Sequence, residues 1–512
     1  MPDNSSNNKR VAKNTLMLYL RMFVTMAIGL YTSRVILQTL GVSDYGVYNV
    51  VGGFVAMLSY LNTVFVGATQ RFIVFTLGEN DPDKLKRLFK SSITVHFIIG
   101  IIILIVAETF GLWFVNNKLN IDADRMVAAN WVYQCSVLSL ILTIINVPYK
   151  SCVVAHEHMH LYAYVSIVES VLKLGIVFLL LIIPGDKLII YSILMLLIMI
   201  VVPVWYIIYC RRFDECSFGF GFDKGMIKEM GSYAGWLLVG NLGFSFKDQF
   251  SNIIMNLFLG TSINAARGVA AQVNSIITSF ADNFTMALNP QITKQYAAGE
   301  IEQSQKLVYS GARYAFFLMA MIAIPVIMNI DYILELWLGV VPEYTSQFVV
   351  ITIVASLFYS ISKTTTTAIQ ATGDIKWFQI GISIIMLLEL PAAFVLLKLQ
   401  YPPYYALMPA IATSVMGLIF RFFILKKQVP SYSIKYYFIN IVLRSVSIMC
   451  LSFAISYLLC SMLEMNFWTF LLSSFLSVIV SATIIYFMGL TGSERNLLKK
   501  YLYSKIHYNH AE

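Results

Sequence analysis

The chain has 512 residues and a formal net charge of +9, and it is 58% hydrophobic and only 12% charged. Soluble domains carry about a quarter charged residues, so this composition excludes a soluble enzyme, a secreted domain and a disordered scaffold. No basic run lies apart from the apolar segments, so we expect no nucleic-acid partner. The six cysteines form no CxxC pair, so we expect neither disulfides nor a metal site.

Fourteen apolar segments are each long enough to cross a bilayer, which takes about 20 residues. Their approximate limits are 14–40, 46–77, 91–115, 126–148, 160–183, 188–210, 229–259, 266–293, 307–338, 345–370, 376–398, 404–425, 436–460 and 466–490. Lysine and arginine together number 22 in one set of alternating loops and 5 in the other. Because cytoplasmic loops hold the excess, we predict an all-α polytopic membrane protein with both termini in the cytoplasm.

The two halves of the chain contain an internal repeat. Leu40-Gly41 is matched by Leu259-Gly260, 219 residues later, and Trp113 is matched by Trp337, 224 residues later. Both copies begin on the same side of the membrane, so the repeat is parallel, and we expect its two lobes to enclose a central cavity near the midplane. The predicted parts are a six-span lobe at 1–225, a second six-span lobe at 226–430, and two further spans with a cytoplasmic tail at 431–512.

Polar side chains form stripes along the first, seventh and eighth predicted spans when residues are placed 100° apart. A membrane helix satisfies its own backbone groups, so a polar stripe indicates a face that meets water. Such side chains also join helices to each other in lipid, which is the structural alternative. The predicted cavity-lining residues are Thr25, Asn241, Ser245, Asn252, Asn274, Thr278 and Thr285.

Several ionisable residues lie well inside the predicted spans, where each costs about 2.5–3.5 kcal/mol unless it is paired or hydrated. Glu169 and Lys173 are one helical turn apart and are expected to pair, while Arg421 is expected to reach the membrane surface. A cleft with more positive than negative charge suits an anionic substrate such as a phosphate or diphosphate. The basic residues that fit no structural explanation are Arg21, Lys247, Arg267 and, more weakly, Lys363.

Catalytic motifs are absent: the sequence has no P-loop, GxSxG or HExxH, so we expect no catalytic residue. A membrane glycosyltransferase or polymerase is the enzyme alternative, but it would need acidic residues in a sizeable outer loop, and the outer loops here are short. The run His156-Glu157-His158-Met159-His160 looks like a cluster of metal ligands. Alternate histidines on a helix point to different faces, so we expect no metal there either.

Local motifs resemble those of the multidrug/oligosaccharidyl-lipid/polysaccharide exporter superfamily, and in particular its polysaccharide-transporter branch, the Wzx-type O-antigen flippases. The matching residues are Arg34-Val35-Ile36-Leu37, Leu40-Gly41-Val42-Ser43-Asp44-Tyr45-Gly46, Gln70-Arg71-Phe72, Ile333-Leu334-Glu335-Leu336-Trp337-Leu338-Gly339 and Ala371-Thr372-Gly373-Asp374. The resemblance covers nearly the whole chain and implies the MATE-like fold of two six-helix lobes, here with two additional C-terminal helices.

The resemblance implies a flippase for undecaprenyl-diphosphate-linked oligosaccharide, the repeat unit of an O-antigen, capsule or exopolysaccharide. Such a protein works in the bacterial inner membrane by alternating access. Its cationic cavity would fall on Arg21, Lys247 and Arg267, with Asp248 and Asp282 as ion-coupling or counter-charge candidates. We expect a monomer with no cofactor besides a Na⁺ or H⁺ gradient, and a polysaccharide polymerase with assembly proteins as partners. The alternative within the superfamily is a multidrug or cation antiporter, which favours an acidic cleft.

Overall fold

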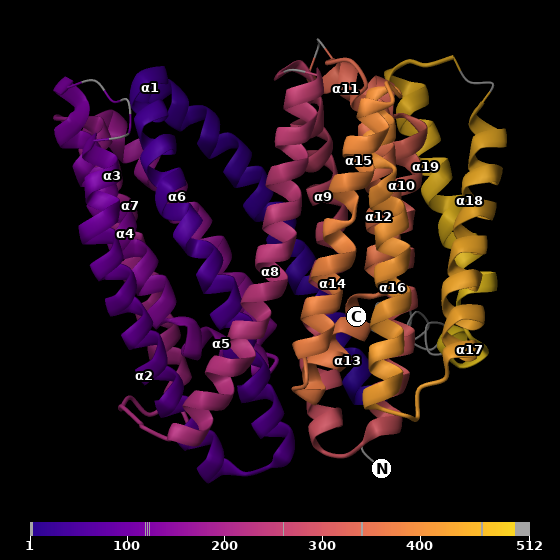
Figure 1. The fold of residues 1–512 in the computed structure, drawn as a ribbon, viewed down its shortest axis with the longest axis horizontal. Helices are drawn as coiled ribbons and strands as arrows, with labels where there is room; N and C mark the ends of the chain where they lie inside the picture. Colours follow the sequence, from indigo (N-terminus) through magenta and orange to yellow (C-terminus); the bar gives the residue numbers. More distant parts are fainter. Residues whose placement is uncertain are drawn as a thin grey trace, which may run out of the picture. The chain divides into compact units, whose positions relative to one another are not determined.

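The computed structural model describes residues 4–117, 119, 121, 123–259, 261–338, 341–461 and 464–496. The regular structure is helical, and the described residues include no strand (Figure 1). The predicted cytoplasmic tail beyond residue 496 lies outside the described part of the chain. The all-α prediction is therefore confirmed for the residues that the structure describes.

The helices of the first half are bounded as follows, with η marking π and 3₁₀ segments. They are α1 (Asn4–Glu79), α2 (Pro82–Val106), η1 (Ala107–Gly111), α3 (Leu112–Asn117), η2 (Ala123–Arg125), α4 (Met126–Ile145), α5 (Val147–Ala155), α6 (Met159–Ile182), α7 (Lys187–Cys210) and α8 (Lys224–Leu259).

The second half continues in the same way. Its helices are α9 (Thr261–Ala297), α10 (Ile301–Met328), α11 (Ile330–Leu338), α12 (Thr345–Ile361), α13 (Lys363–Thr372), α14 (Lys376–Leu387), α15 (Glu389–Lys398), η3 (Pro403–Leu407), α16 (Pro409–Gln428), α17 (Ile434–Tyr436), η4 (Tyr437–Leu443), α18 (Arg444–Cys460), α19 (Phe467–Ile484) and η5 (Ile485–Gly489).

Contacts divide the chain into two compact units. Unit 1 comprises Met1–Asn241 and Ala287–Ile301, and unit 2 comprises Leu242–Met286 and Glu302–Glu512. Helices α8 and α9 therefore each contribute residues to both units. The predicted parts 1–225, 226–430 and 431–512 group membrane spans, whereas these two units group residues in contact. The three-part division stays a prediction.

Nine helical segments among the described residues are long and apolar enough to cross a membrane, and a tenth is added if the bent pair α12–α13 is one span. These ten coincide with ten of the fourteen predicted spans. The other four predicted spans are helical as well, and they lie on α1, α8 and α9. The count of fourteen spans remains a prediction.

Helix α1 holds both of the first two predicted spans, 14–40 and 46–77, in 76 residues. The sequence predicts an interruption at Leu40-Gly41, but the structure continues as helix through these residues. At 1.5 Å per residue a straight helix of this length would measure about 114 Å, against about 30 Å for the hydrocarbon core. The ribbon instead folds back on itself near the α1 label in Figure 1, so both predicted spans lie on one bent helix.

Unit 1 is held together by an apolar core and by one close helix approach. Tyr133 on α4 is fully buried, and its hydroxyl donates a hydrogen bond to the carbonyl of Ala107 at 2.7 Å. A Cβ added at Gly78 would lie 2.6 Å from the Lys294 carbonyl oxygen and 2.7 Å from the Cβ of Ala297. The end of α1 therefore lies directly against the end of α9, and only glycine fits there.

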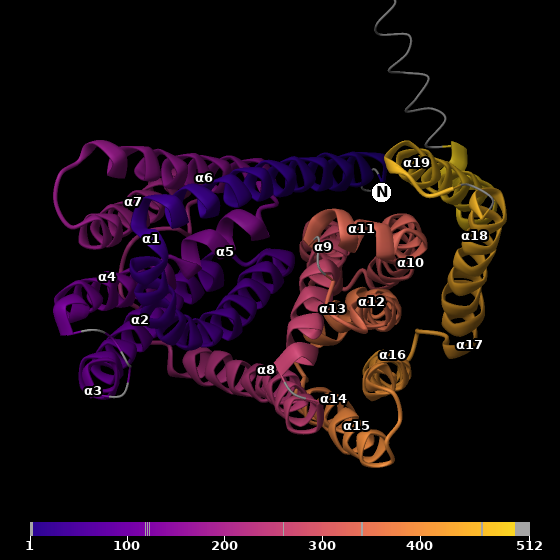
Figure 2. The same cartoon turned by 90° about the horizontal axis from the view of Figure 1, so that it is seen from above.

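Unit 2 ends in a helix pair, α18 and α19, which pack against each other. In Figure 2 these two helices lie at the rim of the unit, beyond α10, α12 and α16. Both helices carry buried serines, an arrangement typical of helices that approach closely in lipid. The buried serines are Ser445, Ser452, Ser456, Ser473, Ser477 and Ser481.

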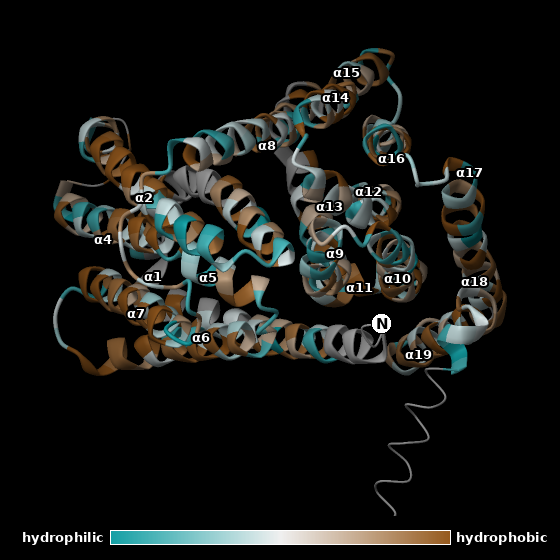
Figure 3. Cartoon of the chain, turned by 90° about the horizontal axis from the view of Figure 1, so that it is seen from below, coloured by the Kyte–Doolittle hydropathy of each residue, from teal (hydrophilic) through white to brown (hydrophobic). Residues whose placement is uncertain are grey.

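Large apolar side chains lie exposed on both units. Ile182 on α6 is 80% exposed and Phe475 on α19 is 65% exposed, and Figure 3 shows apolar residues along most helices. Soluble monomers rarely leave such large apolar areas in water. Lipid covers these side chains in a multi-pass membrane protein, which is the class that the apolar helices and their exposed faces indicate.

Candidate functional site

Three of the ion pairs inside unit 2 involve three of the four predicted basic residues. The first joins Lys247 on α8 to Glu389, the first residue of α15, with 3.4 Å between Nζ and Oε2. The Glu389 side chain is only 4% exposed and that of Lys247 is 17% exposed. Each charge thus compensates the other in a region that keeps both from water.

The second ion pair closes the α8–α9 hairpin. Arg267 Nη2 donates to the Asp248 carboxylate at 2.9 Å, and Nη1 donates to the Asn252 side-chain oxygen at 2.6 Å and to the Asp248 carbonyl at 3.3 Å. The planar guanidinium can serve all three acceptors at once, which an ammonium group could not do with the same geometry. Three residues of the predicted stripes therefore form one connected site.

The third ion pair lies where a membrane helix breaks. Helices α12 and α13 are bent by 41° around Ser362, and Lys363 is the first residue of α13. Its Nζ contacts the carboxylate of Asp282 on α9. Lys363 also lies 5.6 Å from the centre of the Tyr359 ring. The bend thus directs a basic side chain from α13 toward the polar stripe of α9.

Exposure is unequal within two of these pairs. The bases Arg267 and Lys363 are each 11% exposed, whereas their partners Asp248 and Asp282 are 52% and 60% exposed. Each buried cation is therefore covered by an acid that faces open space. Each of these three bases has a carboxylate partner, so Asp248 and Asp282 occupy the place of counter-charges in this structure.

Arg21 belongs to unit 1, on α1. Its guanidinium lies 4.9 Å from the centre of the Tyr162 ring on α6, and Lys150 Nζ lies 5.1 Å from the same ring. Thr25 donates a hydrogen bond to the Arg21 carbonyl at 2.8 Å, within the same helix. Arg21 thus makes a cation–π contact with the Tyr162 ring, and it belongs to a different unit from the three ion pairs above.

Most of the predicted polar stripe residues donate hydrogen bonds within their own helices. Asn241 donates to Leu237 O, Thr278 to Ser275 O and Thr285 to Ala281 O. These contacts do not join helices, so they do not support the alternative that the stripes serve helix packing. Ser245 and Asn274 are half-buried, Asn241 is exposed, and Thr285 is buried at 5% exposure.

Two residues near this site were not assigned to it by the sequence. Glu389 is one of them, since no spacing rule links it to Lys247, which lies 142 positions earlier. Arg421 was predicted to reach the membrane surface, and this is wrong because its side chain is buried at 3% exposure. Its guanidinium lies 5.1 Å from the centre of the Tyr359 ring, and Lys363 Nζ lies 5.6 Å from that ring centre. Arg421 thus belongs to the surroundings of Lys363.

Other intramembrane charges have structural partners. The predicted pair is confirmed, with 2.6 Å between Lys173 Nζ and Glu169 Oε1. The His156–His160 run does not converge on a common point. His156 contacts Glu215, His158 contacts the Tyr209 hydroxyl, and Glu157 lies against Gln291 and Lys294.

Comparison with known families decides the class of the protein. A family model described as "Polysaccharide biosynthesis protein" matches residues 11–296, which is more than half of the chain. The chain belongs to this family. A second model, MatE, matches residues 237–395. The family is the polysaccharide branch of the exporter superfamily that the sequence motifs resemble, and its members and neighbours are membrane transporters. No curated protein matches the chain.

Solved structures show the same fold. A mutant of the Vibrio cholerae MATE transporter VcmN has a TM-score of 0.69 at 17% identity, covering 84% of this chain and 98% of its own. An outward-facing multidrug resistance MATE family transporter has a TM-score of 0.69 at 12% identity, covering 83% and 97%. The MATE transporter ClbM in complex with Rb⁺ has a TM-score of 0.68 at 14% identity, covering 83% and 96%. The polysaccharide family member therefore has the fold of MATE transporters.

Proposed function

We propose that this family member is a flippase that moves undecaprenyl-diphosphate-linked oligosaccharide across the bacterial inner membrane by alternating access. The family match and the MATE fold support a membrane transporter. The diphosphate is the part of such a substrate that needs positive partners, and Arg267, Lys247 and Lys363 in unit 2 and Arg21 in unit 1 are the residues we assign to it.

The observation that carries this proposal is the unequal exposure within the ion pairs. Asp248 and Asp282 cover Arg267 and Lys363, yet both acids are more than half exposed. A carboxylate in that position can rotate toward water at little cost, whereas the buried cation then needs another anion. A phosphate group meets this need, because its oxygens accept the same charge-assisted hydrogen bonds. The acids thus act as exchangeable counter-ions that keep the cations compensated when no substrate is bound.

The test is lipid flipping by the purified protein in liposomes. A fluorescent undecaprenyl-diphosphate-linked sugar is placed in the membrane, and a reductant that does not cross the bilayer reports the fraction in the outer leaflet. We expect Arg267→Gln to slow flipping at least tenfold, since a charge-assisted hydrogen bond contributes about 1.5–3 kcal/mol. Lys173→Gln removes another intramembrane base, one whose partner Glu169 lies on its own helix, and should flip at the wild-type rate. Wild-type vesicles that flip no faster than protein-free vesicles would contradict the proposal.

A second candidate function, a multidrug or cation antiporter, is favoured by one observation. The exposed members of two ion pairs are carboxylates, and carboxylates bind cations directly. The discriminating measurement uses the same vesicles with a cationic dye under a Na⁺ or H⁺ gradient. Dye export that is lost in Asp248→Asn, together with no lipid flipping, would favour the antiporter.

The remaining parts of the proposal concern the setting of the protein. We place it in the inner membrane with both termini cytoplasmic, as a monomer driven by a Na⁺ or H⁺ gradient, with a polysaccharide polymerase and assembly proteins as partners. The positive-inside count supports the orientation. Purification of the tagged protein from native membranes, followed by light scattering and a search for co-purified proteins, tests the oligomeric state and the partners.

A further inference from the structure

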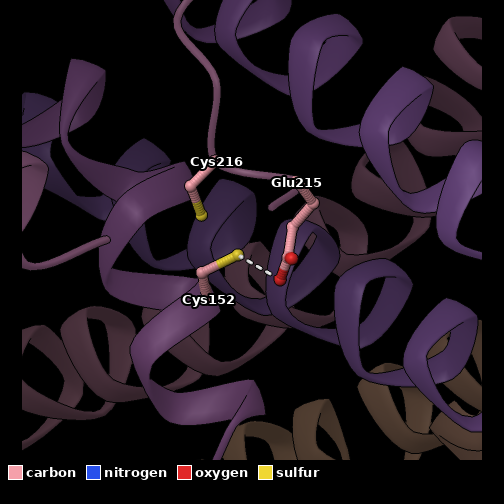
Figure 4. Close-up of side chains that lie close together, drawn as sticks. All are labelled: Cys152, Glu215 and Cys216. Carbon is pink, nitrogen blue, oxygen red and sulfur yellow. Dashed lines mark hydrogen bonds between the residues drawn. The ribbon is translucent and has the colours of Figure 1, made fainter. Parts of the chain in front are cut away.

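A cluster of sulfur and carboxylate groups lies in unit 1, and none of its residues is among those assigned to transport. Cys152 is on the short helix α5, and Glu215 and Cys216 are in the segment between α7 and α8. All three are buried, with Cys152 fully so and the other two 7% exposed. Figure 4 shows both sulfurs and the carboxylate directed toward a common space.

We propose that Cys152, Glu215 and Cys216 bind a zinc ion that clips α5 to the segment leading into α8. One donor atom from each residue lies within 4.8 Å of the other two. Tetrahedral zinc with Zn–S bonds of about 2.3 Å places its sulfur ligands about 3.8 Å apart. The donor atoms are thus close to the required spacing, and a shift of about 1 Å or less would bring them to the separation that zinc needs.

The donor set selects zinc among the common metals. Two thiolates and a carboxylate suit zinc, whereas magnesium and calcium prefer oxygen ligands alone. A fourth donor is close by: Cys210, which ends α7, donates its thiol to the Tyr149 carbonyl at 3.4 Å and also interacts with Cys216. Cys210 is fully buried, but its sulfur is not among the donor atoms that lie within 4.8 Å of one another, so it would have to move to take the fourth position.

The carboxylate ligand is oriented by a second group. His156 Nε2 lies 2.6 Å from Glu215 Oε1, and the His156 ring stacks on Phe213 with 4.0 Å between ring centres. Carboxylates that bind metals are themselves commonly hydrogen-bonded in this way, which fixes their orientation. His156, which sequence reasoning considered only as part of the His156–His160 run, thus serves as a support for the ligand Glu215.

The site has an entry path. A cavity of about 360 Å³ is lined by Cys216 together with Tyr149, Arg211 and Asp214, among others. An ion can therefore reach the Cys216 sulfur without unfolding of the unit. The segment containing Arg211 is on the predicted cytoplasmic side, where thiols stay reduced and metal binding is favoured over a disulfide.

The sequence expectation of no metal site rested on the absence of a CxxC pair. The structure brings Cys152 together with Glu215 and Cys216, which lie 63 and 64 positions later in the chain, because α5 packs on α7. Only the adjacent pair Glu215-Cys216 is visible as a local pattern. No spacing rule for zinc covers this arrangement.

The test is metal analysis of the purified full-length protein. We expect about one zinc ion per wild-type chain, and at least a tenfold lower zinc content in Cys152→Ser and Cys216→Ser. Cys135→Ser, which removes a buried cysteine on α4, is the matched control and should keep its zinc. Zinc at the wild-type level in Cys152→Ser would overturn the proposal.

A second measurement does not depend on whether the serine variants fold. The rate at which a thiol reagent modifies the native wild-type protein is measured with added Zn²⁺ and with a chelator. Protection of at least two of the six cysteines by Zn²⁺, reversed by the chelator, is the expected result. Unchanged rates would contradict the proposal. A count of fewer than six reactive thiols in the unfolded protein, taken without a reductant, would also contradict the proposal, because it would indicate a disulfide.

Discussion

The Lys247–Glu389 pair permits a sharp test of how this protein keeps charges within the membrane. The change is Lys247→Met, which leaves the Glu389 carboxylate without its partner at 4% exposure. The compensating change is Glu389→Leu, and the double variant replaces both charges by apolar side chains of similar size. The three variants and the wild type form a double-mutant cycle.

The magnitude follows from the geometry. At 3.4 Å and an effective dielectric constant of 20, the two charges attract each other by about 5 kcal/mol. Desolvation of both groups offsets most of this energy, so the intact pair contributes little net stability. Removal of one partner leaves an uncompensated buried charge and costs about 3–5 kcal/mol. We expect Lys247→Met to be near the upper value and Glu389→Leu near the lower, because the Lys247 side chain is 17% exposed and can be partly hydrated.

The assay is thermal unfolding in detergent, followed by tryptophan fluorescence. At about 2 °C per kcal/mol, each single variant should lower the Tm by roughly 6–10 °C, and the double variant should return close to the wild-type value. Lipid flipping by the double variant should remain impaired, because the proposed diphosphate partner is absent. Additive losses in the two single variants would refute the reasoning about the pair, and full flipping by the double variant would refute the role of Lys247 in transport.

Further predictions concern water access, pH and packing. Asn274→Cys should react with a water-soluble maleimide in intact membranes and Thr285→Cys should not, since Thr285 is only 5% exposed; equal labelling would contradict the described face of α9. Burial acts to raise the pKa of Asp186, but hydrogen bonds from Arg125 and from two backbone amides hold that pKa below its ordinary value. The stability from this contact is therefore present at neutral pH and is lost as the pH falls below about 4. Arg125→Gln should lower the free energy of unfolding by about 1 kcal/mol at pH 7 and weaken its dependence on acid. A variant whose Tm depends on pH in the same way as that of the wild type would contradict this prediction. Gly78→Ala should lower stability by about 1–3 kcal/mol, because its Cβ would collide with backbone of α9, and a Tm equal to wild type would show that the two helices can separate without cost.

The sequence predicts the class of fold well because lipid imposes a strong rule. Apolar runs must be helical in a membrane, and all fourteen predicted spans lie on helices of the structure. The break expected at Leu40-Gly41 is absent, because α1 continues as helix through these residues, and hydropathy does not distinguish one bent helix from two helices joined by a loop.

The site was predictable in its members but not in its pairing. The polar periodicity identified Arg267, Asp248 and Asn252 from two adjacent helices, and these do meet in the structure. Glu389 could not be matched to Lys247, since their contact depends on how α15 packs on α8. Arg421 was misjudged because its position near a span end allows a side chain to extend outward, and only the neighbouring rings show that it turns inward.

The Arg313 contact has a consequence for the synthesis of the protein. Arg313 on α10 is 8% exposed, and it donates hydrogen bonds to the Glu494 carboxylate at 2.7 Å and to the Gly489 carbonyl at 3.1 Å. Glu494 is made 181 residues after Arg313, a delay of roughly 10–40 s at ordinary translation rates. Throughout that time α10 carries a charged group whose partner has not left the ribosome. We therefore expect the part of α10 around Arg313 to stay hydrated until then and to reach its final contacts in unit 2 only after α19 has been made.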